Sequence, residues 1–291
     1  MRSLLFVPAH DERKLAKGQG AGADALIVDL EDAVPEAEKA SARVTGSAFV
    51  RTSAATMRLF VRINGLSTPH ALADLDAVVP AAPYGVMLPK CEGAGDLVAL
   101  SELLAAREEA AGLTVGSIRI LPIVTETAAG VLALASYGQL PAGAKARLCG
   151  LMWGGEDLAA DIGAVANKDA EGRYTAPYQL ARTLTLLGAT AAQVPAVDAV
   201  YTNFRNPEGL QAEGAEAVRD GFCAKAAIHP DQIATIHAVF TPRDEELAWA
   251  RRVIAAFDAA PSAGAIALDG KMLDRPHYRS AQRLLTRAGQ A

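Results

Sequence analysis

The chain has 291 residues, 51% of them hydrophobic, with 28 basic and 33 acidic side chains and a formal net charge of −5. This length and apolar content suffice for one large α/β domain or two medium ones. No run of Lys and Arg is long enough to indicate a nucleic-acid partner, and no apolar run approaches the roughly 18 residues of a membrane-spanning helix.

Short β-branched runs alternate along the chain with longer stretches rich in Ala, Leu, Glu and Arg. We predict strands over residues 3–9, 25–31, 58–64, 85–90, 118–126, 147–154, 196–204 and 224–230. We predict helices over residues 12–22, 36–49, 71–79, 94–112, 128–138, 176–193, 209–221 and 231–240. Eight such repeats favour a closed (β/α)8 TIM barrel, with an open doubly wound sheet as the alternative.

The last fifty residues are not needed to close a barrel. We therefore predict a catalytic barrel domain over residues 1–240 and a C-terminal helical extension over residues 241–291. An amphipathic helix begins the extension, with Thr241 as N-cap and Pro242 at the first helical position. A short hairpin around Asp269-Gly270 and a last helix follow. The extension is either a lid or an oligomerisation arm.

The termini and cysteines indicate a cytoplasmic protein. The stretch MRSLLFVPAHDERK at residues 1–14 becomes charged too early for a signal peptide. Cys91, Cys149 and Cys223 lie far apart and form no CxxC pair, so we expect neither a zinc site nor a disulfide framework.

Nearly every predicted strand ends in an ionisable or amide side chain, and in a barrel those ends line the active-site mouth. These residues are His10, Asp29 with Glu31 and Asp32, Arg62 with Asn64, Lys90, Glu126, Glu156 with Asp157, Asn203 with Arg205, and His229.

Glu126 and Asp157 close the fifth and sixth strands, and neighbouring strands lie about 4.8 Å apart. Two carboxylates at one level can hold a cation; without one they repel, and one takes up a proton. Oxygen ligation with few protein ligands fits Mg²⁺, with Mn²⁺ as the second choice. The alternative is that both residues cap the helices that follow them.

The charged neighbours have open roles. Arg62 either pairs with Asp29 or Glu31 on the adjacent strand, or binds a substrate carboxylate or developing oxyanion. Lys90 is either solvated at the rim or a partner of the acidic cluster. His229 is more typical of a hydrogen-bonded core histidine than of a catalytic base.

Taken together, the motifs resemble those of the citrate lyase β-subunit-like (CitE-like) proteins of the HpcH/HpaI aldolase superfamily, which includes malyl-CoA and citramalyl-CoA lyases. The resemblance runs nearly end to end, through RSLLFVPA, GADALIVDLEDAV, VRIN, LPKCE, PIVTETAAGVL, WGGEDLAADIG, AIHPDQI, FTPRDEEL and GKMLDRPH. It implies a Mg²⁺-dependent barrel that makes or breaks a carbon–carbon bond beside a thioester or keto acid.

The resemblance also implies roles for individual residues. Glu126 of TET and Asp157 of GGEDL would be the metal ligands, and Arg62 would contact the keto acid and the enolate oxygen. Asp274 of GKMLD would be a catalytic acid/base that reaches into a neighbouring subunit's site, which makes the extension an arm in a homo-oligomer, a trimer or hexamer. Where relatives commonly carry Asp, this chain has Asn206, which leaves substrate choice open.

Further binding candidates surround these residues. Gly154 and Gly155 would let the backbone approach the substrate closely. Asp29, Lys90 and Glu156 are candidate substrate contacts, and we expect Glu156 itself to meet a basic side chain or a helix N-terminus.

A substrate that carries coenzyme A needs basic groups at the rim for its phosphates. Arg13 and Lys17 are candidates, although a solvated helix face explains them equally well.

The sequence therefore predicts a Mg²⁺-dependent lyase that cleaves, or forms, a 3-hydroxyacyl-CoA such as malyl-, citramalyl- or citryl-CoA, with an acyl-CoA and a keto acid as products. Two alternatives stay open. One is a CoA-independent class II aldolase that uses pyruvate, and the other is a non-catalytic subunit that binds a dicarboxylate.

Overall fold

The computed structural model describes residues 1–289, which divide into two compact units between Ile236 and His237. The boundary falls inside a helix, a few residues before the predicted end of the barrel domain at residue 240.

The first unit is built on eight parallel strands in the order β5-β4-β3-β2-β1-β8-β7-β6. They are β1 (Ser3–Pro8), β2 (Ala25–Asp29), β3 (Arg58–Arg62), β4 (Gly85–Leu88), β5 (Arg119–Pro122), β6 (Leu151–Met152), β7 (Ala196–Asp198) and β8 (Ala224–Ala227). Parallel bridges from Ile120 to Leu148 and from Ile123 to Met152 join the two edges of the sheet. The predicted TIM barrel is confirmed.

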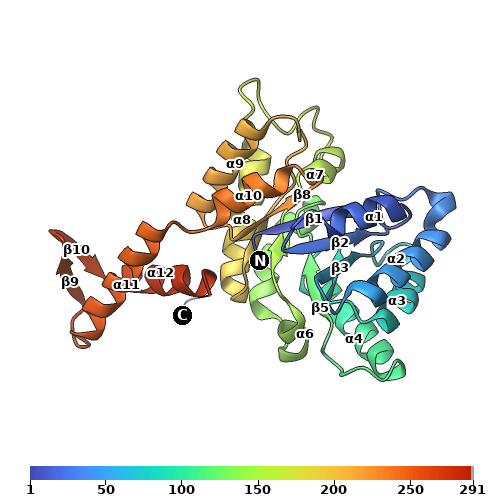
Figure 1. The fold of residues 1–291 in the computed structure, drawn as a ribbon, viewed down its shortest axis with the longest axis horizontal. Coiled ribbons are helices and arrows are strands. Elements are labelled where there is room, and N and C mark those ends of the chain that lie inside the picture. The colour runs from blue at the N-terminus through green and yellow to red at the C-terminus, as the bar shows by residue number, and fades with distance from the viewer. Residues whose placement is uncertain (290–291) are drawn as a thin grey trace. The chain divides into compact units, whose positions relative to one another are not determined.

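Helices surround the strands (Figure 1). They are α1 (Glu12–Gln19), α2 (Lys39–Ser53), α3 (Ala71–Val78), α4 (Ala94–Ala110), α5 (Ala128–Leu132), α6 (Ala142–Arg147), α7 (Glu156–Asp161), α8 (Ala176–Ala192), α9 (Pro207–Asp220) and α10 (Gln232–Phe240), with 3₁₀ turns η1 (Glu36–Glu38), η2 (Val79–Ala81) and η3 (Leu134–Gln139). The predicted strand over residues 147–154 is wrong at its start, because Arg147 still belongs to α6; Leu148 makes an isolated bridge to Ile120, and Leu151–Met152 form the strand.

The barrel interior is filled by alternate strand residues, all at most 3% exposed. They are Leu4, Ala25, Ile27, Phe60, Met87, Leu121, Ile123, Met152, Val197, Ala224 and Ala226. The other face of each strand is buried beneath the helices, which explains the continuous apolar runs in the sequence. Gly85 makes room for the largest member, since a Cβ there would lie 2.7 Å from the Phe60 ring.

The second unit has its own core. It contains α11 (Asp244–Asp258), the antiparallel hairpin β9 (Ala265–Leu268) and β10 (Lys271–Asp274), and α12 (Arg275–Arg287). Asp269 and Gly270 have φ of 49° and 74°, as a tight two-residue hairpin turn requires. Seven side chains at most 7% exposed form the core: Leu247, Ala250, Val253, Phe257, Leu273, Ala281 and Leu285.

The predicted start of the first helix in this unit is wrong. Arg243, not Thr241, is the N-cap of α11, because the Glu246 carboxylate accepts hydrogen bonds from the Arg243 backbone and guanidinium. Thr241 instead donates its hydroxyl to the carbonyl of His237, closing the end of α10.

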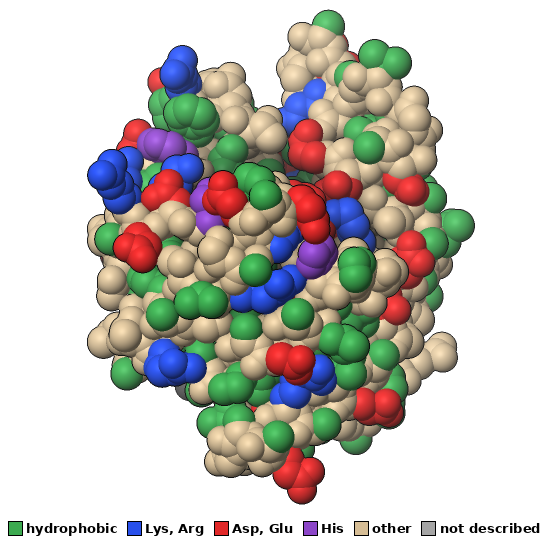
Figure 2. All heavy atoms as spheres, turned by 90° about the vertical axis from the view of Figure 1, so that its right-hand side faces the viewer, with side chains coloured by type: hydrophobic (Ala, Val, Ile, Leu, Met, Phe, Trp, Pro, Cys, Tyr) green, Lys and Arg blue, Asp and Glu red, His purple; other side chains and the backbone are tan. Residues whose placement is uncertain are grey.

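The surface that carries α2 and α3 mixes Lys and Arg with Asp and Glu rather than separating them (Figure 2). Over residues 1–289, no helix combines the length and the apolar character that a bilayer crossing demands.

Candidate active site

The carboxyl ends of the barrel strands surround a cavity of about 450 Å³. Its acidic lining consists of Asp29, Asp32, Glu126, Glu156 and Asp157. Its apolar lining consists of Phe6, Pro8, Ala33, Ile123, Met152, Ala199, Val200 and Ile228. Gly154 also lines it, and within residues 1–289 Arg62 is the only cationic side chain that does so. The cavity therefore has an acidic half and an apolar half.

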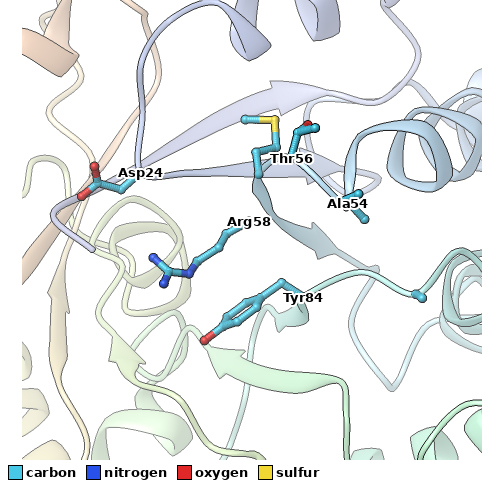
Figure 3. A pocket seen from close by; sticks show the side chains of 8 residues that line it. Asp24, Ala54, Thr56, Arg58 and Tyr84 are labelled. Atoms are coloured by element: carbon cyan, nitrogen blue, oxygen red, sulfur yellow. The ribbon is translucent and has the colours of Figure 1, made fainter.

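A second hollow, of about 500 Å³, lies at the opposite ends of β2, β3 and β4 (Figure 3). The Arg58 guanidinium packs over the Tyr84 ring there, 5.7 Å from its centroid. Because catalytic groups of TIM barrels gather at the carboxyl ends of the strands, we assign the active site to the first cavity.

Arg62, at the end of β3, is held by two carboxylates of the neighbouring strand β2. Its Nε and Nη2 donate to Asp29 Oδ1 and Oδ2 at 2.8 and 2.6 Å, and its Nη1 lies 2.9 Å from Glu31 Oε2. Burial alone would lower the pKa of Arg62, but Asp29 and Glu31 raise it, so the guanidinium stays charged. The hydrogen bonds to Asp29 use two of its five N–H donors, and Nη1 meets Glu31 as an ion pair without a hydrogen bond, so donors remain for a ligand.

Lys90 donates hydrogen bonds to the acidic cluster from both its backbone and its side chain. Its φ of 49° is left-handed, an unusual conformation for a residue with a Cβ. In that conformation its N–H donates to Glu126 Oε2 at 2.5 Å, and its Nζ donates to Glu31 Oε1 at 2.5 Å. Nζ also lies 3.7 Å from Asp157 Oδ1. Of the two predicted alternatives, the structure shows the charge partner.

Glu126 follows β5 and is 4% exposed. Burial, together with the charges of Glu31 and Asp157, raises its pKa to about 8, although the Lys90 N–H opposes the shift. Glu126 lines the cavity, and its Oε1 accepts no hydrogen bond from the described part of the chain. A largely buried carboxylate with a second carboxylate nearby is stabilised by a cation.

Asp157 and Glu156 form the first turn of α7, where helix N–H groups favour negative charge. Both line the cavity. The Asp157 side chain is 37% exposed and reaches toward Lys90. Of the two expected surroundings of Glu156, the structure shows the helix N-terminus rather than a basic side chain, and its Oε1 accepts from the Asn167 amide at 2.8 Å.

The two adjacent glycines have different surroundings. A Cβ at Gly154 would lie 3.0 Å from both Glu126 Cγ and Ile123 Cγ2, so this glycine gives Glu126 its space. A Cβ at Gly155 would lie 3.0 Å from the Trp153 ring, and Gly155 does not line the cavity. The Thr125 hydroxyl bonds both the N–H and the carbonyl of Gly154 at 2.9 Å.

The donor set of the acidic half fits a hard divalent cation. Glu126 and Asp157 offer only oxygen, and Mg²⁺ characteristically takes one or two carboxylates plus water or substrate oxygens. Across residues 1–289, no group of three or more His, Cys, Asp or Glu side chains is arranged around one ion. An ion at this site would therefore complete its shell from solvent and substrate.

Several other predicted residues lie outside this cavity. Arg13 and Lys17 are exposed on α1 and form no ion pair among the described residues. Asp274 belongs to the second unit, where it is the N-cap of α12 and its Oδ1 lies 2.6 Å from His277 Nδ1.

Asn206 and His229 have local structural partners. Asn206 is the N-cap of α9: its Oδ1 accepts from the Gly209 N–H at 2.9 Å, which explains an amide or carboxylate at this position. His229 is partly exposed and stacks on Phe204 with ring centroids 4.7 Å apart, so it is not a core histidine.

Sequence reasoning missed the apolar half of the cavity. Phe6 and Pro8 share one face of β1, so the two-residue period of a strand could have identified them. Ala199, Val200 and Ile228 lie within the predicted strands, but β7 and β8 end before them, so the two-residue period does not assign their side chains to a face.

The eight-stranded barrel is closed, and its carboxyl-terminal mouth combines clustered acidic oxygens, a buried arginine and an apolar wall. These features define a barrel enzyme with an oxygen-rich active site. The family model described as HpcH/HpaI aldolase/citrate lyase matches residues 2–230. The chain belongs to this family.

Individual relatives are similar over nearly the whole chain. The (3S)-malyl-CoA thioesterase of Cereibacter sphaeroides is 36% identical over 296 residues, which cover 99% of this chain and 94% of that protein. The mitochondrial citramalyl-CoA lyase of Mus musculus is 34% identical over 296 residues, which cover 99% of this chain and 86% of that protein. The crystal structure of CitE from Mycobacterium tuberculosis with magnesium, acetoacetate and coenzyme A matches with a TM-score of 0.78 and 35% identity. The match covers 99% of this chain and 98% of that chain.

Proposed function

We propose that this protein is a Mg²⁺-dependent carbon–carbon lyase that cleaves a 3-hydroxyacyl-CoA into an acyl-CoA and a 2-oxo acid, and can run the reaction in reverse. The observation that carries the proposal is the pair of carboxylates, the largely buried Glu126 and the partly exposed Asp157, that line one cavity at the catalytic end of the barrel. Kinship with a citramalyl-CoA lyase, and with a protein crystallised with magnesium and coenzyme A, supports it.

In this proposal, Glu126 and Asp157 hold Mg²⁺, or Mn²⁺ in its place. The ion supplies Lewis-acid stabilisation of the hydroxyl and carboxylate oxygens of the substrate and serves as a template for their orientation. The backbone N–H of Lys90 holds Glu126 Oε2, which leaves Oε1 directed to the cavity.

Cleavage begins when a base removes the proton of the 3-hydroxyl group. The bond between C2 and C3 breaks, C3 becomes the carbonyl of the 2-oxo acid, and the electron pair forms the enolate of the thioester. Protonation of C2 then gives the acyl-CoA. Arg62 has N–H donors that are not used by Asp29 and that can serve a developing oxyanion, and removing such a donor typically costs on the order of 10²–10³ in turnover.

We assign the proton transfer at C2 to Asp274 of a second subunit. Its carboxylate is 46% exposed on the side chain and oriented by the N-terminus of α12 and by His277. This assignment makes the protein a homo-oligomer, a trimer or hexamer, with sites shared between subunits. Arg13 and Lys17 on α1 are our candidates for the phosphates of coenzyme A, and we take the cytoplasm as its location.

The test is to incubate the purified protein with Mg²⁺ and malyl-, citramalyl- or citryl-CoA, and to measure the 2-oxo acid and the acyl-CoA by chromatography. We expect both products in equal amounts, and none in EDTA. If no thioester is cleaved but pyruvate condenses with an aldehyde, the protein is a CoA-independent aldolase. If free coenzyme A and the hydroxy acid appear instead, it is a thioesterase, as one relative is named.

A non-catalytic dicarboxylate-binding protein is the remaining alternative. It would bind a dicarboxylate tightly yet turn over none of the three thioesters. Both candidate metal carboxylates are present in this chain, which favours an enzyme.

A further inference from the structure

The barrel closes between β5 and β6, and we call this junction the seam. The other pairs of neighbouring strands share ladders of two to five residue pairs, whereas isolated bridges join the two sides of the seam. The carboxylates proposed to hold Mg²⁺ lie on opposite sides of it, because Glu126 follows β5 and Asp157 follows β6. The spacing of the two ligands therefore depends on how the seam is held together at the mouth of the barrel.

One side chain forms hydrogen bonds across the seam directly beside the ligands. Thr125, the residue before Glu126, is fully buried. Its hydroxyl group donates to the Gly154 carbonyl and accepts from the Gly154 N–H, both at 2.9 Å. A parallel ladder that continued to this level would bond those two groups of Gly154 to the backbone of the neighbouring strand. The Thr125 hydroxyl therefore replaces two backbone hydrogen bonds across the seam.

The position of this hydroxyl group also affects where the ligands lie. A Cβ at Gly154 would lie 3.0 Å from Glu126 Cγ, so the backbone that Thr125 holds packs closely against the Glu126 side chain. Three residues further along, the same segment carries Asp157. Because threonine is β-branched, its χ1 angle is restricted, and its hydroxyl has few alternative positions. A shift of the contact between Thr125 and Gly154 would move one ligand relative to the other.

A second hydrogen bond crosses the seam on the outer side of the ligands. The Asp161 carboxylate, at the end of α7, accepts from the Ala128 N–H, at the start of α5, at 2.7 Å. The two cross-seam contacts thus lie on either side of Glu126 and Asp157 along both segments. Because the outer hydrogen bond is exposed to water, it contributes less than the buried ones of Thr125.

We propose that Thr125 is a positioning residue for the metal site. Its hydroxyl group holds Glu126 and Asp157 at the separation that one divalent cation requires, and Asp161 supports it from the outer side. Thr125 does not line the cavity, so it acts through the two ligands. The inference rests on the proposed function, because it takes Glu126 and Asp157 as the Mg²⁺ ligands.

The test is calorimetric titration of the purified protein with Mg²⁺, in the absence of substrate. Thr125→Val keeps the shape of the side chain but removes the hydroxyl, so we expect Mg²⁺ to bind about tenfold more weakly, as for other groups that orient metal ligands. Thr125→Ser keeps the hydroxyl and should bind Mg²⁺ nearly as tightly as the unaltered protein. An unchanged affinity in Thr125→Val, or an equal loss in Thr125→Ser, overturns the inference.

Thr185→Val is the matched control for the loss of a buried hydroxyl. The Thr185 hydroxyl is equally buried, but it donates to the Ala181 carbonyl within α8, and Thr185 does not line the cavity. This variant should bind Mg²⁺ as the unaltered protein does. An equal loss of affinity in Thr125→Val and Thr185→Val contradicts a role specific to the seam.

Asp161→Ala covers the case in which Thr125→Val does not fold, because Asp161 lies on the surface. This variant removes the outer hydrogen bond, so we expect Mg²⁺ to bind about threefold more weakly. Its control is Asp11→Ala, since Asp11 also accepts a backbone N–H, that of Lys14, at an exposed place away from the seam. When Thr125→Val cannot be measured, equal affinities in Asp161→Ala and Asp11→Ala overturn the inference.

The outcomes distinguish this inference from the proposed function. If the Mg²⁺ affinities follow the expected order but none of the three thioesters is cleaved, the lyase is refuted and the role of Thr125 stands. If the unaltered protein binds no Mg²⁺, both are overturned.

Discussion

Substituting Glu126→Gln should stabilise the metal-free protein and abolish its response to Mg²⁺. The pKa of Glu126 rises from an ordinary value of 4.5 to about 8. Below pH 4.5 the group is protonated in both the folded and the unfolded chain. Between about pH 4.5 and 8 only the unfolded chain is ionised, so the free energy of unfolding falls as the pH rises, and above about 8 the fall ends.

The size of this effect follows from the shift. A pKa change of one corresponds to 1.36 kcal/mol in the free energy of unfolding, so the loss of stability above pH 8 is at most roughly 5 kcal/mol. Because water in the open cavity partly solvates the carboxylate, we expect the actual loss in the free energy of unfolding to be about 1–3 kcal/mol. Glutamine cannot ionise, and its carbonyl keeps the hydrogen bond from the Lys90 N–H. The variant should therefore lose the fall in stability with pH.

The assay is urea unfolding at pH 5, 6, 7 and 8, in EDTA and in 10 mM Mg²⁺ (roughly the excess that mass-action stabilisation needs). In EDTA at pH 8, Glu126→Gln should be more stable than the unaltered chain; in Mg²⁺ only the unaltered chain should gain stability. A variant that is destabilised at pH 8 in EDTA, or that still responds to Mg²⁺, refutes the reasoning.

The control for this prediction is Glu108→Gln, which should have the opposite effect. The Glu108 carboxylate is also buried, but Arg147 binds both of its oxygens, at 2.9 and 2.6 Å, and its pKa is lowered by these and by backbone N–H donors despite burial. Glutamine there leaves the Arg147 charge uncompensated, which costs about 3–5 kcal/mol.

The remaining predictions concern other parts of the site. Asp157→Asn should abolish Mg²⁺-dependent turnover and leave the thermal midpoint in EDTA nearly unchanged, because this side chain is 37% exposed; turnover at the unaltered rate would contradict its role as a ligand. Arg62→Met should lower the free energy of unfolding by about 3–5 kcal/mol in urea titrations, because Asp29 and Glu31 stay buried without their cation; a loss below about 1 kcal/mol would show that the pairs contribute little. Gly154→Ala should reduce Mg²⁺ affinity in calorimetry by displacing Glu126, and an unchanged affinity would mean that the neighbouring side chains yield. Inactive Asp274→Asn and Asp157→Asn subunits, refolded together, should regain part of the activity if sites are shared, and absence of rescue would place the whole site in one subunit.

The positions of the charged residues could be predicted because the barrel imposes a rule. Because each strand ends at the same rim, the sequence predicts that Asp29, Arg62 and Glu126 lie together, and all three line the cavity. Two kinds of feature escaped this rule. Local geometry determines the left-handed backbone of Lys90 and the hydrogen bond between Glu156 and Asn167. Hydrophobic periodicity predicts neither of these features.

Tertiary context explains the other misses. The predicted strand over residues 147–154 is shorter in the structure, because helix α6 continues to Arg147; Leu148 then bridges to Ile120, and the two-residue strand β6 follows. The apolar half of the cavity includes Val200 and Ile228, which lie inside the predicted strands but just beyond the ends of β7 and β8, so the strand period does not assign them to the cavity.

The left-handed backbone of Lys90 has a consequence for genetics. Its amide, not its side chain, holds Glu126, so any of the other genetically encoded side chains except proline would leave that hydrogen bond donor in place. Proline would remove the donor, but its ring forbids a φ of 49°, so it would rearrange the loop at the same time. A mutational scan of residue 90 therefore measures the loss of the ammonium group together with each side chain's tolerance of a left-handed φ, and it does not measure the amide. Substitutions of the side chain do not remove the backbone N–H of residue 90. An amide-to-ester replacement at this residue, made by chemical ligation, removes that donor and measures its contribution to holding Glu126.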